Sequence, residues 1–217
     1  MKSTYKEFRE RAWAMLEGKW WQMAVVMLVF LALSMVPSML GFPMGKWSWT
    51  TLVLTLLLCP MTYALKAGFL RMDRGGEAIK AGELFDIYKT NFAGSFAVVF
   101  LTILFTFLWM LLFFIPGVIM SYAYSMAIYI AADHPELTPM ECIKRSKELM
   151  KGHKWNLFVL DLTFIGWMLL ALLTGGILTL FVAPYQEMAR AEFYREIIAE
   201  GQPEEITADA AVAAEAE

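Results

Sequence analysis

The chain alternates long uncharged stretches with short polar ones. In the clearest stretch, the 22 residues from Ala93 to Phe114 carry no charge. A helix rises about 1.5 Å per residue, so this run can cross a hydrocarbon core of ~30 Å. Pro116-Gly117 interrupts the run, and a second uncharged segment continues to Ala132. Because backbone polar groups in lipid must bond within the chain, the pattern predicts a helical hairpin in the membrane.

Similar pairs of apolar runs occur on both sides of this central hairpin. The earlier pair surrounds a loop rich in Trp, Pro and Gly, and the later pair surrounds Gly175-Gly176. We therefore predict an all-α polytopic membrane protein with six transmembrane helices arranged as three hairpins. The expected outer spans are about 20–40, 50–65, 156–173 and a last one ending near Arg190.

A polar stretch with helical periodicity precedes each hairpin. In residues 3–18, Phe8, Ala12 and Met15 share one face, which is typical of a helix lying in the membrane surface. A short helix over 83–90 precedes the central hairpin. Before the third, Thr138 and Glu141 form the pattern of a capping box, and the helix should run to Lys151. The sequence thus predicts three amphipathic surface helices.

Parts of the chain repeat. Residues 15–23 align with 149–157, sharing a glycine and a tryptophan. Pro60 and Pro184 are followed at the same offsets by a basic residue, alanine and phenylalanine, whereas after Pro116 only Ala123 fits. We favour a tandem repeat over chance similarity. The units are about 3–72, 77–132 and 138–195, within a single membrane domain of residues 1–195. An acidic, disordered or loosely helical tail follows over 196–217.

Composition and charge support this assignment. The chain is 59% hydrophobic and only 18% charged, with mean hydropathy +0.54, whereas soluble domains carry about 25% charged residues. Seventeen Lys and Arg residues fall on one side of the predicted spans, and Lys46 alone falls on the other. This bias places both termini in the cytoplasm. The N-terminus does not read as a cleavable signal, because its apolar run is too long.

Ionisable residues inside the expected spans are the best candidates for a site. Asp161 lies six residues past Trp155 in the fifth span, where a carboxylate costs about 2.5–3.5 kcal/mol on insertion scales. Glu187, Lys66 and Arg190 should lie at a similar depth, so we predict a polar cluster near the cytoplasmic side. A structural role as ion pairs is favoured over a substrate-binding or proton-binding site.

Hydroxyl residues in the fourth span form a second candidate. Tyr122 and Tyr124, with Ser121, Ser125 and Tyr129, could line a pore and bind substrate. Hydrogen bonds to neighbouring helices are the commoner role of such residues in membranes, and we favour that role.

Short motifs rich in glycine, proline and aromatic residues occupy the second half: Ile115-Pro116-Gly117, Tyr122-x-Tyr124-Ser125-Met126-Ala127, Ser146-x-Glu148-Leu149-Met150-x-Gly152-His153-Lys154-Trp155, Phe164-Ile165-Gly166-Trp167 and Pro184-Tyr185. Together they resemble a prokaryotic family of multi-pass integral membrane proteins of unknown function. The similarity is dense from about Leu84 to Tyr194. It implies a location in the prokaryotic cytoplasmic (inner) membrane and a hairpin architecture, but no activity and no catalytic residues.

Three function classes follow from these features. The first, which the sequence favours slightly, is a small-solute transporter or channel-like protein, and the alternative is a non-catalytic scaffold or lipid-interacting subunit. A membrane enzyme is the least favoured, because His134 and His153 have no ligand partner at helical spacing and no catalytic motif occurs. Cys59 and Cys142 suit neither a disulfide nor a metal site, so we expect no metal and no cofactor. The expected partners are the lipid bilayer and either anionic headgroups or a protein at the cytoplasmic face, with no nucleic acid.

Overall fold

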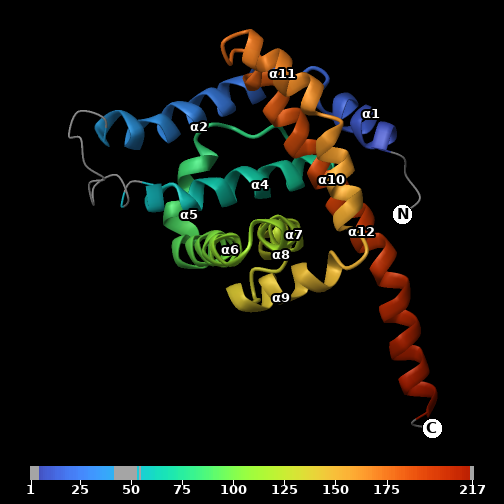
Figure 1. Cartoon of the computed structure of the whole chain (residues 1–217). Helices are drawn as coiled ribbons and strands as arrows, with labels where there is room; N and C mark the ends of the chain where they lie inside the picture. Colours follow the sequence, from blue (N-terminus) through green and yellow to red (C-terminus); the bar gives the residue numbers. More distant parts are fainter. Residues whose placement is uncertain (1–4, 42–52, 54, 216–217) are drawn as a thin grey trace.

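The computed structural model describes residues 5–41, 53 and 55–215, in which every regular element is a helix (Figure 1). The predicted all-α class is confirmed. In chain order the helices are α1 (Tyr5–Leu16), α2 (Trp20–Gly41), α4 (Cys59–Asp73), α5 (Glu83–Thr90), α6 (Phe92–Leu112), α7 (Phe114–Tyr124), α8 (Ala127–Asp133), α9 (Pro139–Leu149), α10 (Lys154–Leu162), α11 (Ile165–Leu173) and α12 (Thr179–Glu215).

Four helical segments in the described ranges are long and apolar enough to cross a membrane: 20–37, 92–112, 114–133 and 154–173. They correspond to the first, third, fourth and fifth expected spans. The expected second span, 50–65, lies partly outside the described residues. The expected sixth span forms the start of α12, whose backbone continues as a helix through the acidic tail to Glu215.

Two of the four segments contain a break where the sequence predicts continuous helix. α7 gives way to α8 at Ser125, and α10 gives way to α11 at Thr163. At both breaks the hydroxyl donates to a carbonyl of its own helix: Ser125 Oγ to Tyr122 O at 2.8 Å, and Thr163 Oγ1 to Leu160 O at 2.7 Å. Such bonds compete with the helical backbone ladder and bend helices.

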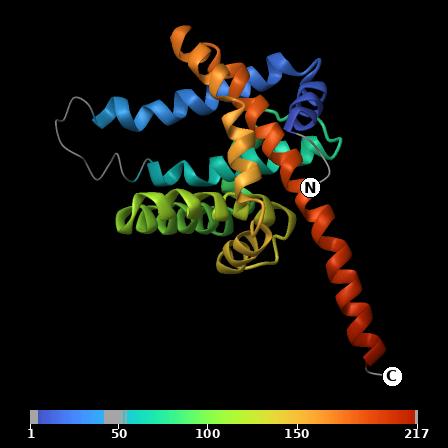
Figure 2. The same ribbon diagram turned by 45° about the vertical axis from the view of Figure 1, so that its right-hand side comes forward.

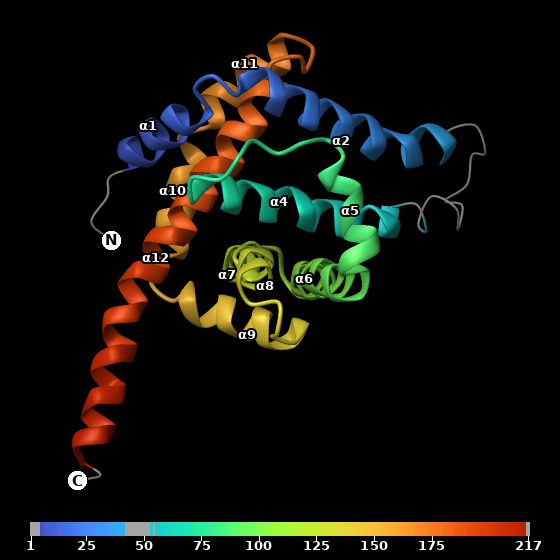
Figure 3. The same ribbon diagram turned by 180° about the vertical axis from the view of Figure 1, so that it is seen from behind.

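The helices extend in different directions from a common region around α4, which we call the base (Figures 1 and 2). α2 and α4 lie lengthwise in Figure 1, whereas α6 and α7 are seen nearly end-on there and lengthwise in Figure 2. α11 and the first part of α12 point to the top in both views. Figure 3 shows the same divergence from behind.

Helix α4 lies at the centre of the base, where it contacts α5, α6, α8 and α12. Ten of its 15 residues are buried, so the other elements pack around it. The largest fully buried side chains, Tyr129, Tyr194, Phe8, Phe69 and Phe164, come from five different helices and breaks that meet in this region.

The far ends of the helices carry exposed apolar side chains instead. Phe114 is 74% exposed at the α6–α7 turn, and Leu173 is 84% exposed at the end of α11. Large contiguous apolar surfaces are unusual on soluble proteins and mark contact with lipid or a partner. The base is thus closely packed, whereas the helix ends expose apolar side chains, and this separation favours a membrane around the ends.

Helix α1 differs from expectation. Its apolar face, expected to rest on lipid, packs against protein: Phe8, Ala12 and Leu16 are fully buried, and the rings of Phe8 and Phe193 lie 5.8 Å apart. Arg11 Nη1 also donates to Glu192 Oε1 at 2.9 Å. An amphipathic pattern shows that one face avoids water, and here α12 covers that face.

Helix α9 begins with the predicted capping box. Thr138 Oγ1 accepts from the Glu141 backbone N–H at 3.4 Å, and the Thr138 N–H donates to Glu141 Oε2 at 2.7 Å. The Thr138 hydroxyl bond and backbone bond hold the pKa of Glu141 below its usual value. The helix ends at Leu149, slightly before the predicted Lys151.

The two aligned junctions share a backbone geometry. Gly18 and Gly152 have φ of +77° and +82°, the left-handed conformation that glycine adopts at helix ends. Each junction then makes the same two backbone hydrogen bonds. In the first junction, the Lys19 N–H donates to Leu16 O at 2.9 Å and the Met23 N–H donates to Lys19 O at 3.1 Å. In the second these are His153 N–H to Met150 O (3.3 Å) and Leu157 N–H to His153 O (3.1 Å), at the aligned positions.

Candidate functional site

A bidentate ion pair joins α10 to α12. Arg190 Nε donates to Asp161 Oδ1 at 3.0 Å, and Arg190 Nη2 donates to Asp161 Oδ2 at 2.9 Å. The side chains are only 27% and 13% exposed, respectively. Paired, planar bonds of this kind are the strongest that a carboxylate forms with a side chain.

Asp161 receives two further hydrogen bonds. The Tyr122 hydroxyl of α7 donates to Oδ2 at 3.2 Å, and Gln186 Nε2 of α12 donates to Oδ1 at 3.2 Å. The carboxylate therefore has four donors from three residues, which compensates for its removal from water.

A second ion pair lies beside the first. Lys66 Nζ of α4 donates to Glu187 Oε2 at 2.7 Å, and the Tyr129 hydroxyl of α8 donates to the same oxygen at 3.0 Å. Arg190 Nη1 lies 3.6 Å from Glu187 Oε1 and connects the two pairs. Lys66 Nζ also sits 5.1 Å from the centre of the fully buried Tyr129 ring. We call Lys66, Tyr122, Tyr129, Asp161, Gln186, Glu187 and Arg190 the polar cluster.

The polar cluster draws one residue from the same sequence position in each expected repeat unit. Lys66, Tyr122 and Arg190 each come six residues after a proline, namely Pro60, Pro116 and Pro184. All three point into the cluster, as their hydrogen bonds show. The cluster thus joins side chains of α4, α7, α8, α10 and α12.

The structure brings together most of the candidate residues that the sequence suggested, and it separates Tyr124 from them. Those that meet are Lys66, Tyr122, Tyr129, Asp161, Glu187 and Arg190. Tyr124 is 6% exposed and packs against Phe105 of α6, with ring centres 6.3 Å apart. Tyr129, which the sequence also suggested, lies in α8 beyond the break at Ser125 and donates to Glu187. Ser121 and Ser125 donate to carbonyls of their own helix at 2.7 and 2.8 Å.

The charges of the cluster balance. Two cations, Lys66 and Arg190, face two anions, Asp161 and Glu187, and each carboxylate contacts a cation on a different helix. A solute that entered would have to displace one of these bonds. Within the described residues, no group of three His, Cys, Asp or Glu side chains could hold a metal ion, and Cys59 and Cys142 are buried free thiols.

Sequence reasoning missed a second ionic network, which joins α1, the end of α4 and α12. Asp73 at the end of α4 and Glu192 of α12 are 0% and 1% exposed. Glu192 accepts from Arg11 at 2.9 Å and from Arg195 at 2.6 Å, whereas the nearest cation to Asp73 Oδ2 is Arg195 Nε at 3.3 Å. No sequence signal connects positions 73 and 192.

Asp73 is the less well paired carboxyl of this network, which favours a proton on it. Neither of its carboxylate oxygens accepts a well-formed hydrogen bond from the described residues. Burial and the neighbouring Glu192 raise the pKa of Asp73 to about 8. Burial alone would also raise the pKa of Glu192, but hydrogen bonds from Asp73, Arg11 and Arg195 lower it. A neutral Asp73 donating to an ionised Glu192 satisfies both groups.

A family described as "Protein of unknown function (DUF975)" matches residues 110–201. The matched region holds six of the seven members of the polar cluster, all except Lys66. Comparison with curated proteins and with solved structures found no match.

Proposed function

We propose that the protein is a non-catalytic, multi-pass integral membrane protein with six spans in three hairpins. It would reside in a prokaryotic cytoplasmic membrane with both termini in the cytoplasm. Four apolar segments of sufficient length support this proposal, as does the gathering of basic residues at one end of the predicted spans. Its three units are tandem repeats, supported by the matching Gly18 and Gly152 junctions and by the shared offset of Lys66, Tyr122 and Arg190 from a proline.

Cysteine labelling in intact cells tests this topology. With Cys59 and Cys142 replaced by alanine, a cysteine introduced at position 46 should react with an impermeant maleimide, because the proposed topology puts this position outside the cell. Cysteines at Lys80 or Lys147 should react only after the cells are lysed. Labelling of a cysteine at Lys80 or Lys147 in intact cells would contradict the proposed topology.

Within this membrane fold we propose that the polar cluster is a latch holding the three units together at the cytoplasmic side. The observation that carries this role is the pairing of each ionised member with a partner on another helix, with distances of 2.7 Å for Lys66–Glu187 and 2.9 Å for Arg190–Asp161. The protein would then serve as a scaffold or lipid-interacting subunit, with its base facing the cytoplasm. An apolar groove of about 500 Å³ between α2, α4 and α6 suits lipid contact on the outside of such a scaffold.

Transport of a small solute is a second candidate, favoured by one observation. Glu187 and Arg190 remain 20% and 27% exposed, so part of the cluster is accessible at the meeting point of three helix pairs. Charged groups at such interfaces bind solutes in transporters built from repeats.

Reconstitution separates the two candidates. We expect liposomes containing the protein to show no more flux than empty liposomes across a panel of ions and metabolites. Asp161→Asn should then change stability alone. Flux that is lost in Asp161→Asn and kept in Glu148→Gln, an exposed control on α9, would establish transport and reject the latch as the whole function.

A further inference from the structure

Arg9 of α1 has no anionic partner in the part of the chain that the structure describes. Nothing there bonds its guanidinium, and of the guanidinium nitrogens only Nε is shielded from water. Arg9 is half-buried, so its stem rests on the protein while the two terminal nitrogens stay open to a ligand. The other arginines differ, because Arg145 is exposed and a carboxylate pairs with each of Arg11, Arg71, Arg74, Arg190 and Arg195.

Arg9 lies in the middle of a strip of α1 that also contains Tyr5 and Trp13, which we call the interfacial strip. These positions are four residues apart, so they share one side of the helix. At one end the Tyr5 hydroxyl donates to Asn156 Oδ1 at 3.1 Å, and at the other the Trp13 ring lies 4.8 Å from that of Trp20. Asn156 and Trp20 belong to the first turns of α10 and α2. The interfacial strip therefore runs from the start of one candidate span to the start of another.

The surroundings of the interfacial strip have the character of a membrane interface. Trp13, Trp21 and Trp155 are 50%, 77% and 69% exposed, and tryptophan is enriched at the level of the lipid headgroups. Tyr185 of α12 fixes Arg9 at the same level, because its hydroxyl donates to Arg9 O at 3.1 Å while its ring lies 5.7 Å from that of Trp13. Under the proposed topology, Arg9 thus lies at the depth of the lipid phosphates in the cytoplasmic leaflet.

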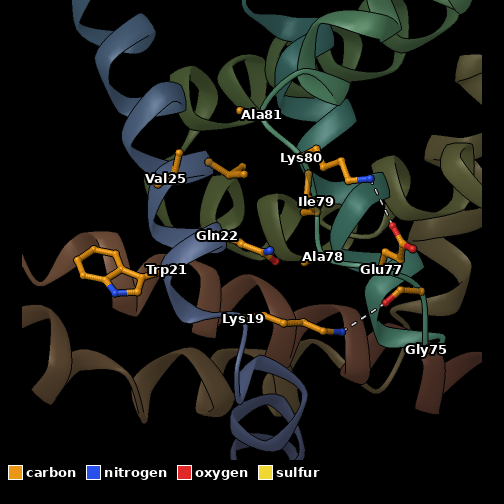
Figure 4. A pocket seen from close by; sticks show the side chains of 12 residues that line it. Lys19, Trp21, Gln22, Val25, Gly75, Glu77, Ala78, Ile79, Lys80 and Ala81 are labelled. Atoms are coloured by element: carbon orange, nitrogen blue, oxygen red, sulfur yellow. Dashed lines mark hydrogen bonds and ion pairs between the residues drawn. The ribbon is translucent and has the colours of Figure 1, made fainter.

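Neighbouring charged groups on α1 and α2 are engaged elsewhere. Glu7 and Glu10, the acids of α1, each pair with a basic residue of the same helix, at 3.8 and 3.5 Å. Lys19 Nζ lies 3.5 Å from Gly76 O and lines a separate cavity of about 730 Å³ between α2 and the segment that follows α4 (Figure 4). Arg9 is therefore a single open cation on an otherwise aromatic strip.

We propose that Arg9 binds the phosphate of an anionic phospholipid of the cytoplasmic leaflet through its two terminal nitrogens, with the exposed ring of Trp13 beside the lipid. A guanidinium presents parallel N–H groups that match two phosphate oxygens. The proposal rests on the membrane placement above and is independent of the latch. It assigns one residue and one lipid site, where the sequence suggested only general attraction by basic faces.

Native mass spectrometry of the full chain in detergent tests the site, with phosphatidylglycerol as the probe and phosphatidylcholine for comparison. We expect Arg9→Gln to weaken binding of the first phosphatidylglycerol about fivefold, since a basic group near anionic lipid contributes up to about that factor. Arg9→Lys keeps the charge but loses the paired donors, so it should weaken binding by about twofold. Phosphatidylcholine carries no net charge, and its binding should change by less than about twofold in either variant.

The matched control is Arg145→Gln, which removes an exposed arginine from α9. An equal loss in this control would mean diffuse charge attraction and overturn the site, as would unchanged binding in Arg9→Gln. Displacement of the lipid by millimolar glycerol phosphate or inorganic phosphate would overturn it in favour of a soluble anion.

A second measurement separates lipid binding from a structural role of Arg9. In lipid-free detergent Arg9→Gln should change the apparent Tm by less than about 2 °C, because no ion pair is lost. A larger fall would show that Arg9 holds α1 in place and would overturn the proposal. Failure of the membrane topology is distinguishable from these results, since the labelling of positions 46 and 147 reports it separately.

Discussion

Replacing Arg190 with methionine should lower the stability of the protein more than any other single change in the polar cluster. The variant leaves Asp161 without its bidentate partner and removes the link to Glu187. Loss of one partner from a largely buried ion pair costs about 2–4 kcal/mol, because the remaining charge stays desolvated. For a chain of this size that corresponds to a fall of roughly 4–16 °C in the apparent Tm in detergent.

The matched control is Lys6→Met. Lys6 pairs with Glu10 at 3.5 Å on the surface of α1, where the two side chains are 81% and 64% exposed. A pair of this kind contributes little, so the apparent Tm should move by less than about 2 °C. Equal effects of Arg190→Met and Lys6→Met would show that the cluster does not hold the units together.

A double variant sharpens the test. Asp161→Asn should be less harmful in the Arg190→Met background than in the wild type, because no ionised carboxylate is then left unpaired. Simple addition of the two single effects would indicate that Arg190 and Asp161 do not interact in the folded protein.

Asp73→Asn should stabilise the protein at alkaline pH and flatten its pH dependence. The folded state holds the Asp73 proton up to a pKa of about 8, whereas an unfolded chain releases it near the ordinary pKa of 3.8. Between these values the folded state binds the extra proton, so the wild-type free energy of unfolding falls as pH rises from about 4 to 8. Above that range Asp73 and Glu192 are both ionised and side by side. Asparagine remains neutral and can still donate to Glu192.

Glu192 works in the opposite sense. Its lowered pKa contributes stability above its ordinary value, and this contribution is lost as pH falls through the folded pKa. That contribution is complete above about pH 5, so it stays constant between pH 5 and 9, and the fall in wild-type stability over this range comes from Asp73. Apparent Tm measured from pH 5 to 9 should show a gain for Asp73→Asn that grows with pH. Asp86→Asn, at an exposed position on α5, is the control, and parallel curves for both variants would refute the shared proton.

Much of the architecture follows from local signals in the sequence. Long apolar runs such as 92–112 need a helix whatever their neighbours, and the box at Thr138 and Glu141 depends on residues three apart. The cluster of Lys66, Asp161, Glu187 and Arg190 was predictable for another reason. Charges at similar depth in apolar helices are costly to bury alone, so they pair with one another.

Other features depend on contacts that no local pattern encodes. Amphipathicity of α1 predicted a buried face but could not distinguish lipid from α12 as its cover. Tyr124 and Tyr129 are alike in sequence, but Tyr129 donates to Glu187 whereas Tyr124 packs on Phe105. The carboxyl pair of Asp73 and Glu192 joins positions 119 apart.

The docking of α1 on α12 has a consequence for biosynthesis. Arg11 and Glu192 are 181 residues apart, which at about 5–20 residues per second means roughly 10–40 s of translation between them. During that delay the ribosome and insertion machinery have not yet delivered the surface on which Phe8, Ala12 and Leu16 finally rest. Under the proposed topology the cytoplasmic leaflet would cover these side chains in the nascent chain, and the helix would leave the bilayer for α12 only when synthesis is nearly complete.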